Sequence, residues 1–423
     1  MKIAVIGAGL AGLTAAWLLG RRPGVAVTLL ESRPAPGFTA SAVGLPPGEF
    51  PPGMRVDVPL RVFYPGYYPT LTRLYAELGV ASDAVSYAST FLDGAGRPYF
   101  RYTNVRVGTN SWSLPTWSSL GARRAWAIAA DAWRFSRRAR AARARGTLAG
   151  LTVAQFAARE GLGADFVEGL MLPAICTVCT CPTALARELP AAWAADYLLR
   201  GLTREAVRRA RHGADDVQAR LLAGVGTLHT DCPVQAVRRE GDGVRVHAGS
   251  GGSELYEHVV FATPAPQAAR MLADASAQEV PVLAGFRTTP VEVVTHRDAS
   301  FLPASRRHWS SVTLRVDPAH EGPESTIWLN AVQPALRGAP DVFQTVSPHR
   351  APAAAQVLGH ARFERPVVDA RSVAALQALA QLHAQPGRRV WFCGAWAQPG
   401  VPLLESAVRS AAEVAERLGA PMP

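Results

Sequence analysis

Three of the five cysteines in the sequence lie within six residues, in the stretch MLPAICTVCTCPT that begins at Met171. Cys176, Cys179 and Cys181 could bind a metal, form a redox pair or line a pocket. A zinc site needs a fourth ligand, and no histidine lies within about thirty residues of the cluster. We therefore expect no metal here. The thiols are interpreted as narrow, polarisable wall residues, with a redox pair as the alternative.

A second group of residues, near the start of the chain, has the spacing of a dinucleotide-binding loop. In KIAVIGAGLAGLTAAWLL the glycines are Gly7, Gly9 and Gly12. The first allows a tight turn, the second lets the backbone approach a pyrophosphate, and the third lets a helix pack on a strand. Glu31 follows about twenty residues on, where a carboxylate can bind ribose hydroxyls. The cofactor contacts predicted here are Gly7, Ala8, Gly9, Leu10, Ala11, Gly12, Glu31, Ser32 and Arg33.

Positioning these residues requires a strand, a tight turn, a helix and a second strand. The apolar run at 3–6, the apolar segment after Gly9 and the stretch VAVTLLE fit those elements. Residues 232–266 predict three short strands separated by glycine-rich turns, and they end on the apolar strand HVVFAT. Near the C-terminus, RRVWFCGAW predicts a strand that runs into Gly394, and LLESAVRSAAEVAERLG predicts a helix.

Length and composition indicate a globular protein of two intertwined domains. The chain has 423 residues, of which 48% are hydrophobic and 18% are charged. Its net charge of +11 comes from arginine, because Lys2 is the only lysine. A basic chain permits an anionic partner without establishing one. No zinc finger, basic zipper or ribonucleoprotein-type aromatic pattern is present, so we expect no nucleic-acid binding.

The same composition bears on the expected location of the protein. Five cysteines in a chain this long do not form a secreted disulfide framework. The N-terminal apolar stretch is interrupted by glycines and has no cleavage site, unlike a signal peptide. No later run reaches the roughly 18 apolar residues that a transmembrane helix needs. We therefore expect a soluble, cytoplasmic protein.

The order of these pieces along the chain resembles the FAD-dependent amine-oxidase superfamily, whose nucleotide domain is assembled from separated segments. The likeness runs nearly end to end and is closest to a bacterial subgroup of NAD/FAD-binding, amine-oxidase-like proteins. It is carried by VDVPLRVFYPGYYPTLTRLYAELGV, THRDASFLPASRRHW, IWLNAVQ and FCGAW. A weaker likeness to flavin-dependent polyunsaturated fatty acid isomerases rests on GLMLPAICTVCTCPTALARELPAAWAADYLL and HGADDVQARLL.

The resemblance implies an α/β fold with two parts. A Rossmann-type FAD-binding domain would be assembled from the discontinuous segments 1–75, 215–270 and 385–423. An α+β substrate domain would comprise 76–214 and 271–384. The stretch AWAQPG has no cysteine at the position where covalent relatives attach the flavin, so noncovalent FAD is expected.

The resemblance also implies further cofactor contacts, at Val234, Gly394, Ala395, Trp396, Leu403 and Leu404. Val234 would meet the adenine through its backbone, and Gly394 would approach the ribityl-phosphate arm. The helix that begins near Leu404 would aim its N-terminal amides at the flavin O2/N1 edge, where they stabilise the anionic reduced ring.

Several positions depart from the pattern of this superfamily. Val291 stands on the strand where many amine oxidases carry a lysine against flavin N5. Ala395 replaces an acidic residue, and Leu403 replaces one aromatic wall of the cage that attracts a substrate nitrogen. These differences favour a bulky hydrophobic substrate, such as an acyl chain or a biosynthetic intermediate, over a simple primary amine.

Other residues are candidates for the pocket. The catalytic or pocket candidates are Cys176, Cys179, Tyr64 and His296. The loop RVFYPGYYPT, with Arg61, Tyr64, Tyr67 and Tyr68, runs near the flavin in relatives, and its tyrosines either form a packed corner or guide a substrate. His296 follows a strand, where a structural role is the alternative to acid–base work.

Residues 120–146 predict a basic amphipathic helix. Trp126 and Trp133 share one face, and six arginines crowd the C-terminal half. We expect the tryptophans to point into the core. The alternative is contact with an anionic membrane surface or an acyl carrier.

Together these features predict an FAD-dependent oxidoreductase that moves a hydride from a substrate C–H to flavin N5, with dioxygen or another acceptor reoxidising the flavin. The substrate bond would lie next to nitrogen or within an aliphatic or allylic chain. The alternatives are a redox-neutral isomerase or cyclase and a protein that binds FAD without catalysis.

Overall fold

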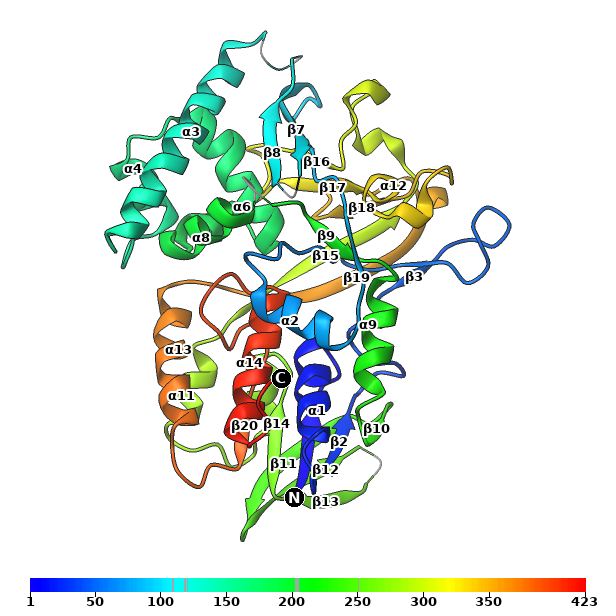
Figure 1. The fold of residues 1–423 in the computed structure, drawn as a ribbon, viewed down its shortest axis with the longest axis vertical. Helices are drawn as coiled ribbons and strands as arrows, with labels where there is room; N and C mark the ends of the chain where they lie inside the picture. The colour runs from blue at the N-terminus through cyan, green and yellow to red at the C-terminus, as the bar shows by residue number, and fades with distance from the viewer. Residues whose placement is uncertain (109, 118, 120, 202–204, 250) are drawn as a thin grey trace.

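The computed structural model describes residues 1–108, 110–117, 119, 121–201, 205–249 and 251–423. The molecule is elongated, with a parallel sheet near the N-terminus and a larger mixed sheet at the opposite end (Figure 1). Within the described ranges, no helix is both long and apolar enough to cross a membrane.

Five parallel strands of the described chain form the first sheet, in the order β10–β2–β1–β14–β20. Their bounds are β1 (Lys2–Ile6), β2 (Ala26–Leu30), β10 (Thr227–His229), β14 (His258–Phe261) and β20 (Val390–Phe392). Ile6 pairs with both Leu30 and Phe261. The C-terminal ends of three strands from distant parts of the sequence therefore meet at one edge, where ligands bind in open α/β sheets.

Successive side chains of a strand point to opposite faces, and both faces of this sheet are covered. Ile3 and Val5 face α1 (Leu10–Gly20) and α14 (Leu404–Arg417), which lie side by side (Figure 1). The neighbouring helices on this side are α2 (Pro69–Glu77) and α9 (Gly213–Leu222).

Ala4 and Ile6 face the other layer of the nucleotide-type domain. This layer contains α10 (Ala265–Met271), α11 (Glu279–Ala284), α13 (Ala370–His383) and an antiparallel sheet of β11 (Val234–Glu240), β12 (Gly243–Ala248) and β13 (Ser253–Tyr256). We expected residues 271–384 in the substrate domain. The structure differs here, because α11 and α13 pack their apolar faces against Phe261 and Phe392 of the parallel sheet.

The larger sheet has eight strands in the described chain, in the order β19–β15–β18–β17–β16–β6–β7–β8. Their bounds are β6 (Ser89–Leu92), β7 (Pro98–Val107), β8 (Asn110–Pro115), β15 (Thr288–His296), β16 (Val312–Arg315), β17 (Glu324–Trp328), β18 (Phe343–Val346) and β19 (Val357–Pro366). Two small strand pairs join β3 (Val43–Gly44) to β4 (Arg55–Val56) and β5 (Ser82–Ala84) to β9 (Arg208–Ala210).

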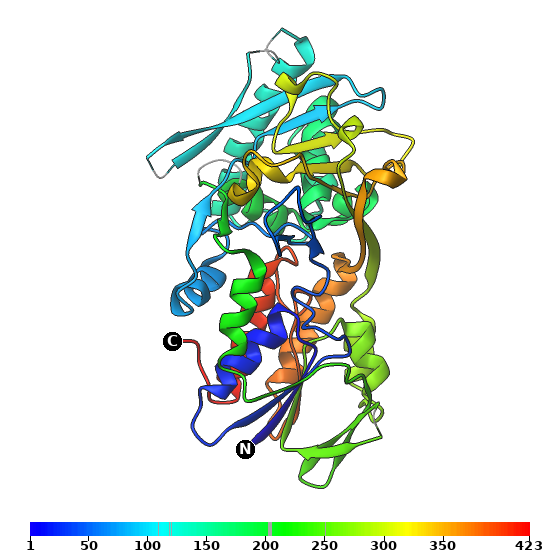
Figure 2. The same cartoon turned by 90° about the vertical axis from the view of Figure 1, so that its right-hand side faces the viewer.

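A group of helices packs beside this sheet (Figure 2). It comprises α3 (Arg123–Ala144), α4 (Val153–Arg159), α5 (Ala164–Phe166), the π-helical turn η1 (Val167–Met171), α6 (Leu172–Cys179), α7 (Thr183–Glu188) and α8 (Ala191–Gly201). Short helical turns occupy the connections, namely η2 (Ala299–Phe301), η3 (Arg306–His308), α12 (Leu329–Val332), η4 (Pro334–Leu336) and η5 (Ala354–Gln356).

The structure corrects one expectation for α3. Trp126 and Trp133 are 57% and 65% exposed rather than buried. The buried stripe consists instead mainly of small or aliphatic residues, including Ala125, Ile128 and Ala139, together with Asp131 and Phe135. Because alanines project little, α3 approaches its neighbours closely through that stripe, and the two bulky indoles are left on the outer surface.

Candidate cofactor and substrate site

The glycine loop after β1 has the geometry that its sequence predicts. Gly7 has φ of 101°, a left-handed conformation that favours glycine, and its amide donates to the Leu30 carbonyl at 2.7 Å. A Cβ on Gly12 would lie 1.8 Å from the Gly7 carbonyl oxygen, so only glycine allows α1 to pack on the loop. A Cβ on Gly9, in contrast, would meet no atom within 4 Å. The backbone at Gly9 therefore borders open space.

The start of α1 is suited to an anion. Gly9 is its N-cap and offers no side-chain hydrogen bond, and the first turn contains no acidic residue. The first amides of a helix lack partners within the helix, and the helix dipole makes this end positive. Leu10, Ala11 and Gly12 thus supply the amide donors that a dinucleotide pyrophosphate requires.

Glu31 joins the end of β2 to this loop. Its Oε2 accepts hydrogen bonds from the amides of Ala8 at 2.9 Å and Gly37 at 3.3 Å. Its Oε1 accepts from the amide of Arg33 at 3.0 Å and from the hydroxyl of Ser32 at 3.3 Å. The carboxylate is thereby oriented by backbone on both sides, beside the open space at Gly9.

The segment before Val234 runs alongside Glu31. The Cys232 amide donates to the Glu31 carbonyl at 2.9 Å, and the Asp231 amide donates to the Arg33 carbonyl at 3.0 Å. Val234 then begins β11. The structure thus brings the predicted adenine contact and the predicted ribose contact together, although they are two hundred residues apart in the sequence.

The C-terminal contacts follow β20. Gly394 has φ of 150°, and its amide donates to the Ser410 hydroxyl at 2.9 Å, which ties it to α14. Leu403 is the N-cap of α14 and provides no side-chain cap. Trp396 donates to the Thr263 carbonyl at 3.0 Å and packs on Phe286, so its indole belongs to the layer with α11 and α13. Ala395 is partly exposed between the two layers.

Arg61 places a cation close to the glycine loop. Its guanidinium lies 4.2 Å from the Phe38 ring centroid and donates to the Phe38 carbonyl. Phe38 in turn donates its amide to the Ala8 carbonyl at 3.1 Å. Burial lowers the pKa of Arg61 while the neighbouring Asp57 raises it, and the side chain keeps some exposed surface. A guanidinium in this position can contact a bound anion.

An apolar surface, nearly fully buried in the structure, lies on the larger sheet where the lysine of amine oxidases is expected. Val291 packs with Val58, Val293 and Val346, and Phe363 of the neighbouring strand extends this surface. Side chains of this kind exclude water and offer no proton to a reacting group.

The three clustered cysteines meet at the end of α6. Thr180 adopts a left-handed conformation with φ of 49°, which turns the chain so that the Cys181 amide donates to the Cys176 carbonyl at 3.2 Å. Cys176 and Cys179 are buried, and Cys181 is partly exposed. A hydrogen bond with Cys181, together with burial, raises the pKa of Cys176 well above its usual range. This thiol therefore stays protonated, as expected of a wall residue rather than a nucleophile.

Cys179 and Cys181 line a small pocket with residues of α7 and with 366–368 and Pro402. Among the described residues, no group of three His, Cys, Asp or Glu side chains is arranged to hold a metal. The cysteine cluster therefore contributes to a pocket near the segment that leads into α14.

The tyrosines divide into packed and accessible side chains. Tyr64 is 1% exposed, and its hydroxyl lies 3.4 Å from that of Tyr197 within an aromatic cluster. Tyr67 is partly exposed, and its hydroxyl accepts a hydrogen bond from the Val401 amide at 3.2 Å. Burial raises the pKa of Tyr67 to about 12. Tyr67, rather than the candidate Tyr64, thus borders the segment before α14.

His296 has a structural position. It is fully buried between Phe301 and Phe343, its Nε2 lies 2.7 Å from the Thr345 hydroxyl, and its Nδ1 accepts from the Asp298 amide at 3.1 Å. Both ring nitrogens are therefore engaged within the far end of the larger sheet. The structure does not bring this candidate to the cysteines.

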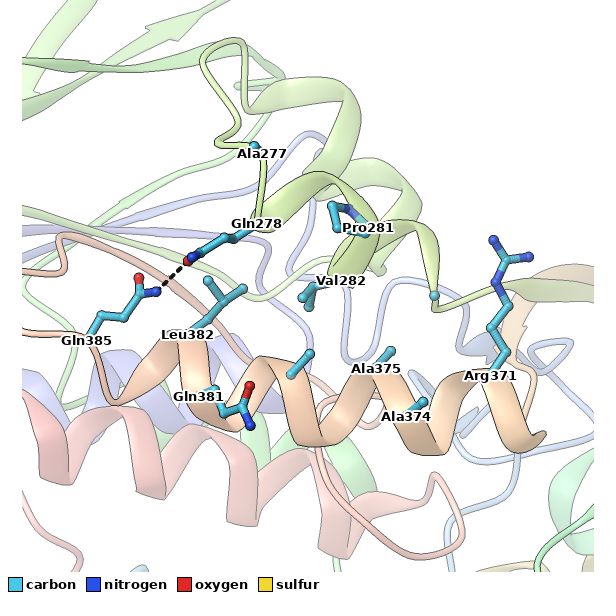
Figure 3. Close-up of a pocket in the computed structure, with 12 residues that line it drawn as sticks. Ala277, Gln278, Pro281, Val282, Arg371, Ala374, Ala375, Gln381, Leu382 and Gln385 are labelled. Atoms are coloured by element: carbon cyan, nitrogen blue, oxygen red, sulfur yellow. Dashed lines mark hydrogen bonds between the residues drawn. The ribbon is translucent and has the colours of Figure 1, made fainter.

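A groove between α11 and α13 is separate from this site (Figure 3). Gln385 donates to Gln278 across one end at 2.6 Å, and Val282, Ala375 and Leu382 form its floor. It lies in the layer that packs on Ala4 and Ile6, on the side of the sheet opposite α1.

Comparison with known proteins bears on the fold. Residues 5–78 match the family model of the NAD(P)-binding Rossmann-like domain. A sequence search of curated proteins finds no match. Solved structures match over the whole chain. A cyclohexylamine oxidase from Brevibacterium oxydans is 16% identical with a TM-score of 0.63, over 99% of both chains.

Two further structures have the same architecture. A protein described provisionally as a protoporphyrinogen oxidase from Exiguobacterium is 16% identical, with a TM-score of 0.66 over 99% of this chain and 98% of that one. A fatty acid isomerase from P. acnes is 14% identical, with a TM-score of 0.66 over 98% of both. The chain has the amine-oxidase fold. The expected α/β class with a Rossmann-type dinucleotide-binding domain is thereby confirmed.

Proposed function

We propose that the protein is an FAD-dependent oxidoreductase that takes a hydride from a C–H bond of a hydrophobic substrate. The observation that carries this proposal is the glycine loop with open space in front of Gly9 and a fixed carboxylate at Glu31. It lies in a chain that shares its fold, end to end, with structures of amine oxidases and a fatty acid isomerase.

The residues present fit a noncovalent FAD. Glu31 would bind the adenosine ribose, the first amides of α1 would bind the pyrophosphate, and the backbone at Val234 would meet the adenine. Arg61 would add a cation beside the phosphates. Cys393 is fully buried, and burial raises its pKa to about 12, so it is not a residue for flavin attachment.

When bound, FAD supplies the ring that accepts the hydride. The chain's own contribution is positioning and exclusion of water. The amides at the start of α14 favour negative charge in front of Leu404. Val58, Val291 and Phe363 provide a dry apolar surface that would orient an aliphatic substrate. With FAD bound, the substrate would lose a hydride and a proton to give an imine or an alkene, with dioxygen or another acceptor as the final oxidant.

A cytoplasmic location is part of this proposal. All five cysteines are free in the structure, which agrees with a reducing compartment.

Anaerobic mixing of the purified holoprotein with long-chain acids, long-chain amines and benzylamine tests the proposal. Bleaching of the flavin absorbance by any of them requires substrate oxidation, and a Gly9→Ala control should show none because it loses the cofactor. If no compound in a broad series reduces the bound FAD, the result would favour a protein that binds FAD without catalysis. Reduction by benzylamine alone would contradict the hydrophobic substrate class.

A redox-neutral isomerase is the second candidate, favoured by the similarity to the fatty acid isomerase of P. acnes. Such an enzyme would shift a double bond and return the hydride, without net consumption of dioxygen or of an artificial acceptor dye. Product analysis together with an oxygen electrode separates it from an oxidase.

A further inference from the structure

Arg365 differs from Arg209 and Arg388, two other deeply placed arginines of the described chain. Arg209 donates to Asp57 at 2.8 Å, and Arg388 donates to Glu279 at 2.8 Å, so each guanidinium has a carboxylate partner. Arg365 makes no ion pair with any described residue. Its Nη2 reaches only the Pro402 carbonyl, at 3.3 Å, and its buried Nε has no hydrogen-bond partner.

The surroundings of Arg365 are those of the candidate substrate site. Burial lowers its pKa, and the groups that counteract this are the thiols of Cys179 and Cys181 and the hydroxyl of Tyr68. The adjacent residue Pro366 and its contact Pro402 line the pocket with the two cysteines. The side chain nevertheless keeps some accessible surface.

The strand that carries Arg365 connects it to the apolar surface. Alternate residues of β19 share a face, so Ala361, Phe363 and Arg365 project in the same direction. The first two pack against Val58, Val291 and Val293. The guanidinium therefore stands at the end of an apolar strip, next to the cysteine wall.

A buried guanidinium without a counter-anion is unfavourable, because its lost hydration is not replaced. Its planar fork matches a carboxylate, which it can bind through two parallel hydrogen bonds. We propose that Arg365 binds the carboxylate of an amphipathic substrate whose aliphatic chain lies along Val58, Val291 and Phe363. This inference rests on the proposed function, and it narrows the substrate class to long-chain carboxylic acids.

Spectral titration of the holoprotein tests the assignment. Dodecanoate should perturb the flavin absorbance saturably, and dodecylamine should not. Arg365→Gln should weaken dodecanoate binding at least about tenfold while retaining FAD, and Arg365→Lys should fall between the two. Arg362→Gln, an exposed arginine on the same strand, is the matched control and should bind normally.

Three outcomes would overturn the assignment. Unchanged dodecanoate affinity in Arg365→Gln would exclude a role in binding the acid, as would a holoprotein that binds no acid of any chain length. Loss of FAD from Arg365→Gln, or a changed flavin reduction potential with dodecanoate binding intact, would assign the guanidinium to the cofactor. A wild-type protein that binds no FAD would instead contradict the proposed function itself.

A second observation concerns the outer surface. Among the described residues, eight large apolar side chains are exposed, and six of them lie between residues 105 and 133. They are Val105, Trp112, Leu114, Trp117, Trp126 and Trp133, which we call the aromatic surface. Trp117 is 91% exposed.

The fold brings two elements that carry these side chains, the β7–β8 hairpin and α3, to one end of the molecule. Val105 pairs with Trp112 across the β7–β8 hairpin, and Leu114 lies on the same face two residues further. The hairpin projects from the end opposite the N-terminus (Figure 2). Helix α3 packs beside it, with the Arg124 guanidinium 3.9 Å from the Tyr99 ring centroid of β7.

The surrounding charge is strongly positive. Residues 101–145 contain ten arginines and one aspartate, a net charge of +9 out of +11 for the chain. Four of these arginines pair with Asp131, Glu160, Asp165 and Asp196. Arg137 lies over Trp133, at 5.3 Å from the ring centroid, and like Arg140 it has no ion pair within the described residues.

Indoles and aliphatic side chains on a projecting element, with arginines around them, match the interface of an anionic bilayer, where rings insert among head groups and guanidinium groups bind phosphates. We propose that the aromatic surface docks the protein on anionic lipid. A long-chain carboxylic acid would partition into the same bilayer, so docking would bring the protein close to the substrate proposed for Arg365.

Co-sedimentation with vesicles tests this docking. Phosphatidylcholine vesicles that contain phosphatidylglycerol should bind the protein about tenfold more strongly than phosphatidylcholine alone, and salt should weaken that binding. Trp112→Ser combined with Leu114→Ser should abolish most of the binding, and Arg137→Gln combined with Arg140→Gln should remove the lipid preference. Leu255→Ser combined with Val280→Ser, which changes exposed apolar residues elsewhere, is the control.

Equal partitioning to both vesicle types, or binding that survives both double substitutions, would overturn the docking proposal. Capture of an acidic acyl carrier protein through the same residues, without vesicle binding, would assign the aromatic surface to a protein partner instead.

Discussion

The Oε2 atom of Glu31 lies 2.9 Å from the amide nitrogen of Ala8, so the carboxylate that ends β2 is fixed on the loop that follows β1. Two further backbone amides, of Gly37 and Arg33, donate to the same carboxylate. These backbone hydrogen bonds therefore hold the carboxylate in one position in the free protein.

Glu31→Gln should lower FAD affinity by at least about tenfold, because the amide presents a donor to backbone amides that need an acceptor. Flavin fluorescence quenching measures the dissociation constant. Glu77→Gln, at an exposed position of α2, should bind FAD as the wild type does. Equal affinity in both variants would show that Glu31 does not contact the ribose.

Gly9→Ala and Gly12→Ala should fail in different ways. A methyl at Gly9 meets no protein atom, so the free energy of unfolding of the apoprotein should change by less than about 0.5 kcal/mol while FAD binding is lost. A methyl at Gly12 collides with the Gly7 carbonyl and should destabilise the fold by about 3 kcal/mol or more. Urea denaturation and flavin content, measured on both variants, distinguish the two. Normal FAD binding by Gly9→Ala would contradict the placement of the pyrophosphate.

Glu279→Gln should destabilise the protein by about 3–5 kcal/mol, because it leaves two guanidinium groups without their buried partner. The carboxylate is 1% exposed and accepts from Arg239 at 2.6 Å, Arg388 at 2.8 Å and the Ser276 amide at 2.9 Å. Urea denaturation gives the free energy of unfolding. The exposed pair of Glu240 and Arg245 provides a comparison, since Glu240→Gln should have little effect. Similar losses of unfolding free energy in Glu279→Gln and Glu240→Gln would show that burial does not increase the contribution of Glu279.

Stability should fall as the pH is lowered below about 6.5, because burial lowers the pKa of His296 to about 4 and that of His383 to about 3. Between these values and the ordinary histidine pKa, the unfolded chain binds protons that the folded chain does not. Each histidine then contributes a slope of up to about 1.4 kcal/mol per pH unit. Denaturation at a series of pH values should give a shallower slope for His383→Gln than for the wild type. Identical slopes would mean that His383 is protonated in the folded protein.

Local sequence patterns predicted the parts of the site whose geometry is local. The strand, turn and helix around Gly7 to Gly12 follow from glycine spacing and an apolar run, and the three strands of residues 234–256 follow from alternation between glycine turns. The structure confirms these elements. Sequence patterns could predict them because their conformations depend mostly on near neighbours in the chain.

Other features depend on contacts that no local pattern contains. Arg365 was not predicted, because its proximity to Cys179 is set by the register of β19 and by the left-handed turn at Thr180. The exposure of Trp126 and Trp133 was wrongly predicted. Helical periodicity defines two faces of α3, but it does not say that the alanine-lined face is the one that packs.

The parallel sheet also has a consequence for the order of synthesis. The strand β1 pairs with β14, which pairs with β20, and α14 covers α1. During synthesis, the strand β14 therefore has one unpaired edge until β20 (Val390–Phe392) has been added. The nucleotide loop after β1 is already present during that time. Such long-range pairing is slow, and an open apolar edge is prone to association with other chains. We expect ribosome-bound intermediates of this protein to depend on chaperones, and its cofactor to be captured only after release.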